Sequence, residues 1–349
     1  MTKLLPALAL LAALPSAALA QSSERHVLSG DHVRIWNLAG RAELVAGSGR
    51  EVVVELTRGG DDGARLTVEA SAGRLIVRYP ARDILYRDRE GSQRFDTTLQ
   101  VDEDGTFSNG RDDDRGGRRV RISGTGGGFE GHADLRIQVP QGQRLSLNVG
   151  VGTVEVVNVN GELELRTHAS PIRARGARGR LTARTGSGRI VLDDIEGERV
   201  QASTGSGDVE LIGVRGAELR ASTGSGGIEG RELRAERFDG STGSGGIRIE
   251  SLTSSDVRAS TGSGSVRLGL LRVPRDLTAR TGSGSVTLGL PSDPNVELDV
   301  RTGSGGISTD FPVTMDQVRR NELRGRIGTG NDGRLRVSTG SGSVRLQRQ

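Results

Sequence analysis

Hydroxyl side chains recur at a regular spacing in the second half of the chain, and they are the clearest candidates for a binding surface. The tetrapeptide Thr-Gly-Ser-Gly, called the corner motif below, occurs eight times, with its threonine at positions 185, 204, 223, 242, 261, 281, 302 and 339. Facing outward, these hydroxyls would form a flat array for a regular ligand such as a glycan or ice. Facing inward, they would hydrogen-bond the backbone at a corner of the fold, which is the arrangement we favour. The candidate ligand-binding residues are Thr204, Ser206, Thr223, Ser225, Thr242, Ser244, Thr261 and Ser263.

Patterns that support catalysis or metal binding are sparse. The acidic runs at 102–104 and 112–114 lack the ligand spacing of a calcium loop, and only Asp208 directly follows a corner motif, so the repeat does not match a calcium-binding β-roll. The sequence has no Gly-x-Ser-x-Gly elbow, no His-Glu-x-x-His pair and no phosphate loop. Four histidines lie outside the exact repeats and far apart: His26, His32, His132 and His168. We therefore expect no catalytic residue, no metal and no cofactor, and predict that the protein is not an enzyme.

The period of the repeat predicts the elements that position the hydroxyls. Successive motifs are 19, 19, 19, 19, 20, 21 and 37 residues apart, and we interpret the last interval as two periods with one degenerate copy between. Apolar residues alternate on both sides of the motif, as in Leu181 and Ala183 before it and Ile190 and Leu192 after it, which is typical of strands with alternate side chains facing inward. The inward positions change from odd to even across the motif. We therefore expect its glycines to absorb one residue at a corner, using positive φ.

This pattern predicts an all-β fold, a single-stranded parallel β-helix or β-solenoid of about 19-residue coils, and we expect right-handed winding. Parallel stacking would make Arg220, Asp239 and Arg258 neighbours in adjacent coils, and would also place Glu210 unfavourably beside Glu229. A third inward position per coil is predicted at Ile195, Val214, Leu233, Leu252 and Leu271.

Composition agrees with a narrow core. The chain has 54 Gly, only eight aromatic residues and no Cys, so a thick globular core and disulfides are both excluded. Apart from Lys3, every strong base is Arg, and the arginines are dispersed among 44 acids. Because a nucleic-acid-binding surface needs clustered bases, we do not expect a nucleic acid as partner.

The chain divides into four predicted regions. Residues 1–20 have a basic start, an apolar stretch and a small-x-small site at Ala18-Leu19-Ala20, which indicates a cleaved signal peptide and no membrane span afterwards. We therefore expect a periplasmic, cell-surface or extracellular protein. Residues 21–81 are predicted to form an N-terminal β cap and first coils. Residues 82–128 are a Gly-, Asp- and Arg-rich insertion, poor in apolar residues and partly disordered, with a hairpin that pairs 95–101 with 119–122. Residues 129–349 form the solenoid.

The repeated unit Ser-Thr-Gly-Ser-Gly-x-Ile-x-Leu, the opening Gly-Asp-His-Val-Arg-Ile at 30–35 and the closing Leu-Arg-Val-Ser-Thr-Gly-Ser-Gly at 335–342 resemble the bacterial DUF4097 family, which carries an adhesin label. The resemblance covers nearly all of the chain after the signal except 82–128. It implies a β-helix at the bacterial envelope and no catalytic residues.

We accordingly predict an exported, non-enzymatic adhesin or structural and binding module of the cell envelope, with a cell-surface glycan or an envelope protein as partner. One alternative is an envelope-stress component that senses or binds a partner or a cationic peptide. The other is a polysaccharide-acting enzyme, which would require three or more acids converging in a groove.

Overall fold

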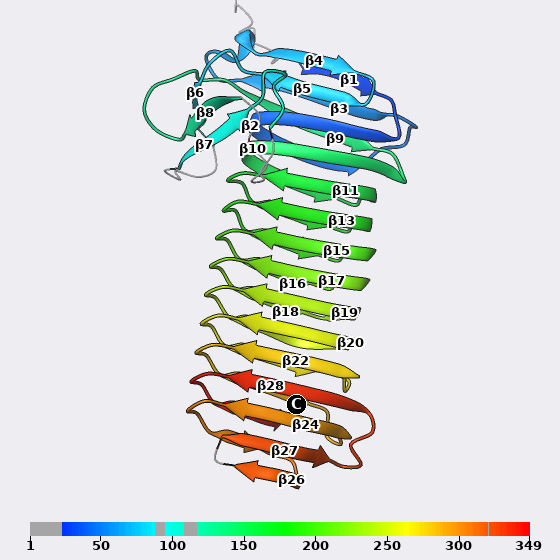
Figure 1. Cartoon of the computed structure of the whole chain (residues 1–349). Coiled ribbons are helices and arrows are strands. Elements are labelled where there is room, and N and C mark those ends of the chain that lie inside the picture. Colours follow the sequence, from blue (N-terminus) through cyan, green and yellow to red (C-terminus); the bar gives the residue numbers. More distant parts are fainter. Residues whose placement is uncertain (1–22, 88–94, 108–116, 320) are drawn as a thin grey trace, which may run out of the picture.

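The computed structural model describes residues 23–87, 95–107, 117–319 and 321–349. Within these residues the fold is all-β, as predicted, and its only helical element is the short η1 (Gly63–Arg65). One 26-stranded sheet winds into a rod of stacked coils, and a three-stranded sheet lies beside its N-terminal end (Figure 1). No helix in this part of the chain is long and apolar enough to cross a membrane. The predicted signal peptide at 1–20 lies outside the described residues.

Each regular coil contributes strands to two walls of the rod. Residues that pair between coils are 18 to 20 positions apart, as in Leu163 beside Leu181, Leu181 beside Val200, and Val257 beside Leu277. All of these pairings are parallel. The strands are β11 (Asn160–Thr167), β12 (Ile172–Arg175), β13 (Arg178–Thr185), β14 (Ile190–Asp193), β15 (Glu196–Thr204), β16 (Val209–Ile212), β17 (Arg215–Thr223), β18 (Ile228–Arg231), β19 (Leu233–Thr242), β20 (Ile247–Thr261), β21 (Val266–Leu270), β22 (Asp276–Thr281) and β23 (Val286–Leu290).

The core is a continuous cluster of buried Leu, Ile, Val and Ala side chains supplied coil by coil. The predicted change of parity is confirmed, because Leu181 and Ala183 are buried before the corner and Ile190 and Leu192 after it. Four of the five predicted third positions are also buried: Ile195, Val214, Leu233 and Leu252. The fifth prediction is wrong. Leu271 is 55% exposed, because a register shift places Leu270 beside Leu252 instead.

Charged side chains on the outside follow the predicted columns. Arg220 lies beside Asp239, which lies beside Arg258, and the Arg220 Nε is 3.7 Å from Asp239 Oδ2. Glu210 does lie beside Glu229, but its Oε1 atom is 3.2 Å from Nη2 of Arg231. The diagonal ion pair offsets the like-charge contact, although each exposed pair contributes only about 0 to 1 kcal/mol.

The C-terminal coils are not stacked in chain order. The strands involved are β24 (Val296–Thr302), β25 (Ile307–Thr309), β26 (Thr314–Arg319), β27 (Glu322–Ile327), β28 (Gly333–Thr339) and β29 (Val344–Arg348). β28 pairs with β22 on one side and with β24 on the other, so the last coil is inserted between two earlier ones (Figure 1). The prediction of a degenerate coil between 302 and 339 is therefore wrong. That segment contains the antiparallel pair β26 and β27, which covers the open edge of β24.

The N-terminal end closes the other edge of the stack. β2 runs parallel to β10 along most of its length and forms the first coil. Antiparallel pairs β1 with β3, β3 with β9, and β4 with β5 then terminate the sheet. These strands are β1 (Ser23–Leu28), β2 (His32–Ala46), β3 (Val52–Gly59), β4 (Thr67–Ser71), β5 (Arg74–Arg78), β9 (His132–Val139) and β10 (Gln143–Val157).

The segment after β5 contains the predicted hairpin, as β7 (Asp96–Val101) and β8 (Arg118–Ser123), with β6 (Asp83–Leu85) parallel to β8. The insertion is poor in apolar residues, but those in its described part are packed. Ile84, Leu99, Val101, Val120 and Ile122 are buried and belong to the same cluster as the core of the rod. The prediction of partial disorder within 82–128 is not tested at 88–94 and 108–116, which lie outside the described residues.

Candidate functional site

The corner motif divides its two hydroxyls between the inside and the outside of the rod. The threonines of the four central copies are 5 to 7% exposed: Thr204, Thr223, Thr242 and Thr261. The serines of the same copies are exposed: Ser206, Ser225, Ser244 and Ser263. Only the serine half of the predicted ligand-binding set is therefore available to a partner, and we call those four serines the serine strip.

Each inward threonine joins its own corner to the preceding coil. Thr223 Oγ1 donates a hydrogen bond to the carbonyl of Gly207 at 2.8 Å and accepts one from the Gly226 N–H at 3.1 Å. The equivalent pair of bonds surrounds Thr204. Because the hydroxyl is buried and uses both its donor and an acceptor lone pair, its role is structural.

Replacement of Thr223 by Val should lower the free energy of unfolding by about 1 to 3 kcal/mol, since the carbonyl of Gly207 and the N–H of Gly226 would be left without these partners. Thr223→Ser keeps the hydroxyl and should lose less. Urea unfolding followed by circular dichroism measures the difference. A larger loss in Thr223→Ser than in Thr223→Val would mean that the methyl group of Thr223, which Val keeps, and not its hydroxyl, stabilises the corner.

The motif glycines serve close packing and not positive φ, which corrects the sequence prediction. A Cβ atom on Gly224 would lie 2.4 Å from the carbonyl oxygen of Gly205, and one on Gly226 would lie 2.0 Å from that of Gly207. The motif glycines do not belong to the set of described residues with positive φ. Positive φ recurs instead at the second corner of successive coils, at Asn158, Gly176, Asp194, Gly213 and Glu232.

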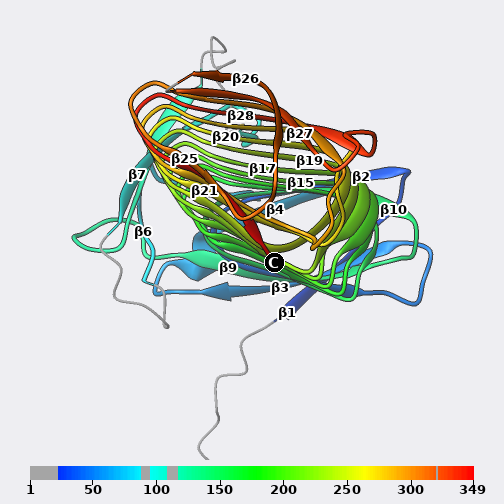
Figure 2. The same cartoon turned by 90° about the horizontal axis from the view of Figure 1, so that it is seen from below.

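The serine strip follows one edge of the rod. Viewed along the axis, successive coils lie over one another with a progressive offset, so equivalent positions form a continuous row along the rod (Figure 2). A second outward column, which the sequence analysis missed, lies one residue before each threonine: Ser203, Ser222, Ser241 and Ser260. The Ser222 hydroxyl donates to Ser203 Oγ at 2.9 Å. The repeated Ser-Thr-Gly-Ser-Gly unit contained the signal for this column.

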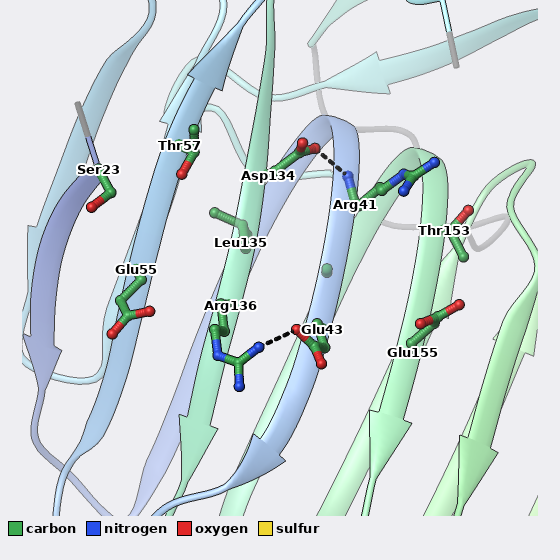
Figure 3. A pocket seen from close by; sticks show the side chains of 11 residues that line it. Ser23, Arg41, Glu43, Glu55, Thr57, Asp134, Leu135, Arg136, Thr153 and Glu155 are labelled. Atoms are coloured by element: carbon green, nitrogen blue, oxygen red, sulfur yellow. Dashed lines mark hydrogen bonds and ion pairs between the residues drawn. The ribbon is translucent and has the colours of Figure 1, made fainter. Parts of the chain in front are cut away.

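A hollow of about 370 Å³ lies on the outer face of the N-terminal sheet, across β1, β3, β9, β2 and β10 (Figure 3). We call this hollow the trough, and the charged side chains that line it are Glu43, Glu55, Asp134, Glu155, Arg41 and Arg136. Glu43 is 2.7 Å from Nη1 of Arg136, and Asp134 Oδ1 accepts the backbone N–H of Arg41 at 2.8 Å. Figure 3 shows the carboxylates spread over the strands, and no three Asp, Glu or His residues in the described ranges gather as a metal site. Four acids thus line the trough, each from a different strand, and Glu43 is paired with Arg136.

A serine and a histidine meet on the outer face of β2 and β10, a contact between residues 114 positions apart that no sequence pattern indicated. His32 Nε2 is 2.8 Å from Ser146 Oγ, which donates to Glu164 Oε2 at 3.0 Å. Partial burial, Arg34 and Arg144 lower the pKa of His32. Because Ser146 directs its proton to Glu164, the serine stands between the base and the acid, unlike a nucleophile–base–acid triad. The three residues link adjacent strands of the stack.

Stacked parallel strands, a narrow aliphatic core and structural threonines place the chain in the class of all-β proteins. A family model described as Toastrack DUF4097 matches residues 51–347, and the chain belongs to this family, which confirms the resemblance found in its sequence. A solved "putative adhesin" from Bacteroides fragilis NCTC 9343 is 12% identical with a TM-score of 0.38, over 93% of this chain and 96% of that chain. A "putative cell adhesion protein" from Clostridium sporogenes ATCC 15579 is 8% identical with a TM-score of 0.17, over 94% and 99%. No curated protein matches the sequence.

Proposed function

We propose that this protein is an exported, non-enzymatic binding module of the bacterial cell envelope with an adhesin-like role, and that the serine strip is its contact surface. The partner we propose is a cell-surface glycan or an envelope protein with a regular surface. We also infer a single parallel β-solenoid of about 19-residue coils with right-handed winding. Pairings of residues 18 to 20 positions apart support this coil length.

One observation carries the proposal: the outward serines keep hydroxyls that the fold does not use. Among the described residues, no hydrogen bond involves the side-chain oxygen of Ser206, Ser225, Ser244 or Ser263, whereas the threonines of the same motifs are engaged. Coils that stack at the inter-strand distance of about 4.8 Å present these hydroxyls at a constant interval. The flanking glycines carry no side chains, so a flat partner can approach closely.

The non-enzymatic part of the proposal is supported by the state of the charged residues. Glu43 of the trough is paired with Arg136, and along the coils carboxylates such as Glu218 and Asp256 are paired with Arg199 and Arg275. A carboxylate whose oxygen is held by a neighbouring guanidinium has less freedom to contact a substrate.

The test compares two quadruple variants of the secreted protein by glycan-array binding and by whole-cell binding in competition with soluble protein. Ser206, Ser225, Ser244 and Ser263 are changed to Ala in the first, and Ser203, Ser222, Ser241 and Ser260 in the matched control. Four lost hydrogen bonds of about 0.5 to 1.5 kcal/mol each should weaken binding at least about tenfold in the first variant. The control should bind like the unchanged protein.

Three results would contradict the proposal: no binding to any glycan, cell or envelope fraction, equal binding by both variants, or turnover of a polysaccharide. Export is checked separately by fractionation and N-terminal sequencing, with a mature chain that begins at Gln21 as the expected result. A chain retained in the cytoplasm would contradict the proposed location in the cell envelope.

A further inference from the structure

A second hollow, of about 700 Å³, lies where the three-stranded sheet meets the N-terminal end of the rod. It is bounded by η1, β4 and β5 on one side and by the ends of β7 and β8 on the other. Leu38, Val77, Tyr79 and Val101, all buried, contribute to its walls. Its size falls within the range of about 300–1,000 Å³ that is usual for small-molecule sites, which combine apolar walls with a few polar groups.

Four guanidinium groups line this hollow, which we call the arginine pocket: Arg65, Arg78, Arg82 and Arg118. Two of them are neutralised by neighbours. Arg65 Nη1 is 2.9 Å from Asp62, and Arg78 Nε is 2.6 Å from Glu69. The positive charge of the pocket therefore rests mainly on the other two arginines.

Arg118 and Arg82 lack a carboxylate partner among the described residues. Arg118 is half-buried, and its Nη2 donates to the backbone carbonyl of Tyr79 at 2.6 Å, which supplies no charge. Arg82 is exposed, and no ion pair or side-chain hydrogen bond engages it within the described ranges. Burial, Arg82 and Arg78 all lower the pKa of Arg118, and no acid among the described residues offsets them.

Two acids also line the pocket and must be weighed. Asp102 has its carboxylate 3.5 Å from the Thr106 hydroxyl, and Glu103 presents its backbone carbonyl to Arg78 Nη1 at 2.7 Å. Neither is among the groups that shift the pKa of Arg118. Within the described part of the chain, the inner end of the pocket thus combines apolar walls with a guanidinium that has no carboxylate partner.

We propose that the arginine pocket binds a small amphiphilic oxyanion, a phosphate monoester or carboxylate on an apolar chain. Arg82 and Arg118 hold the anionic head, and Pro80, the exposed apolar residue of the lining, contacts the chain. Guanidinium groups suit this role because their paired N–H donors match the oxygens of phosphate and carboxylate. The pocket shares no residue with the serine strip, so its failure and that of the proposed function are distinguishable.

The test measures binding of octyl phosphate by isothermal titration calorimetry, at concentrations below those that form micelles. Inorganic phosphate serves as the matched probe for the anionic head alone, and octyl glucoside as the matched probe for the alkyl chain alone. Octyl phosphate should bind with a 1:1 stoichiometry and more tightly than either matched probe. R82Q/R118Q should weaken it about tenfold or more, since charge-assisted hydrogen bonds are lost. The control R119Q/R272Q removes equal charge from exposed positions outside the pocket and should leave binding unchanged.

Thermal unfolding of each variant verifies that the fold persists. If R118Q does not fold, R118K replaces it, since lysine keeps the positive charge but lacks the paired N–H donors of a guanidinium. Equal binding of octyl glucoside and octyl phosphate, no binding of octyl phosphate, or equal loss in both double variants would overturn the proposal. Flotation with phosphatidic acid vesicles identifies the source of the anion. Flotation that R82Q/R118Q abolishes indicates a lipid headgroup, whereas retained octyl phosphate binding without flotation indicates a free anion.

Discussion

Replacement of Gly226 by Ala is expected to destabilise the protein by about 3 kcal/mol, because overpacking of a closely packed site costs about 1 to 3 kcal/mol and sometimes more. The added methyl carbon would lie 2.0 Å from the carbonyl oxygen of Gly207 and 2.5 Å from its carbonyl carbon. Both neighbours are backbone atoms of the adjacent coil, so relief requires two coils to separate. That separation would also weaken the hydrogen bond from Thr223 to Gly207.

The adjacent Gly227 provides the control. A Cβ atom there would meet its nearest neighbour, the carbonyl oxygen of Gly246, at 3.6 Å, which is ordinary van der Waals contact. Gly227→Ala should therefore change the free energy of unfolding by less than about 1 kcal/mol, and the stiffer unfolded chain contributes a small stabilisation. Urea and thermal unfolding of the two variants measure this contrast. Similar midpoints would show that the coils yield easily, and the close-approach explanation of the motif glycines would then be wrong.

Deletion of residues 333–349 is expected to detach more of the chain from the stack than the one coil that is deleted. In a stack that follows chain order, removal of the last coil would only shorten the rod. Here β28 lies between β22 and β24, so its loss leaves β24 to β27 without their contact to the stack. The deleted coil buries Leu335, Val337, Val344 and Leu346, which corresponds to roughly 6 to 12 kcal/mol at about 1.5–3 kcal/mol for each side chain.

Limited proteolysis with mass spectrometry measures the result, and a resistant fragment that ends near residue 290 is expected. The matched control removes one internal coil, residues 224–242, which joins Thr223 to Gly243 and restores an intact corner motif. Because repeat proteins depend mainly on contacts between neighbouring coils, this shorter chain should stay resistant to its C-terminal end. If the truncated chain instead stays resistant through residue 332, the inserted order of coils is incorrect.

Most of the coil could be predicted from the sequence because the alternation of Leu, Val and Ala is strict. Leu181, Val200 and Leu219 repeat at one register, and burial in a narrow core leaves one way to stack them. The position of the last coil could not be predicted in this way. The corner motif at Thr339 is equivalent to those at Thr281 and Thr302, and apolar residues precede all three at equivalent positions. The apolar pattern of the last coil therefore fits beside either of these coils and does not indicate its place in the stack.

The candidate site was only half predictable for a related reason. Alternation of inward and outward residues breaks at the corner, so parity does not indicate which way Thr223 points. Its direction is set by the carbonyl of Gly207, which belongs to the preceding coil and is 16 positions away. The contacts of Ser146 with His32, or of Arg118 with Tyr79, join residues 114 and 39 positions apart and have no local signature.

The inserted last coil also determines the order in which the rod can form. Most coils pair with residues about one period away, and such local contacts close quickly as the chain becomes available. The pairing of Thr281 with Thr339 instead joins residues 58 positions apart, so it forms only after the whole chain has been made available. Until then, β24 and the hairpin that follows it cannot dock onto the rest of the stack. A slow final folding phase is therefore expected, in which the C-terminal strand enters a gap that earlier segments leave open, and removal of that strand should abolish this phase while the fast phases persist.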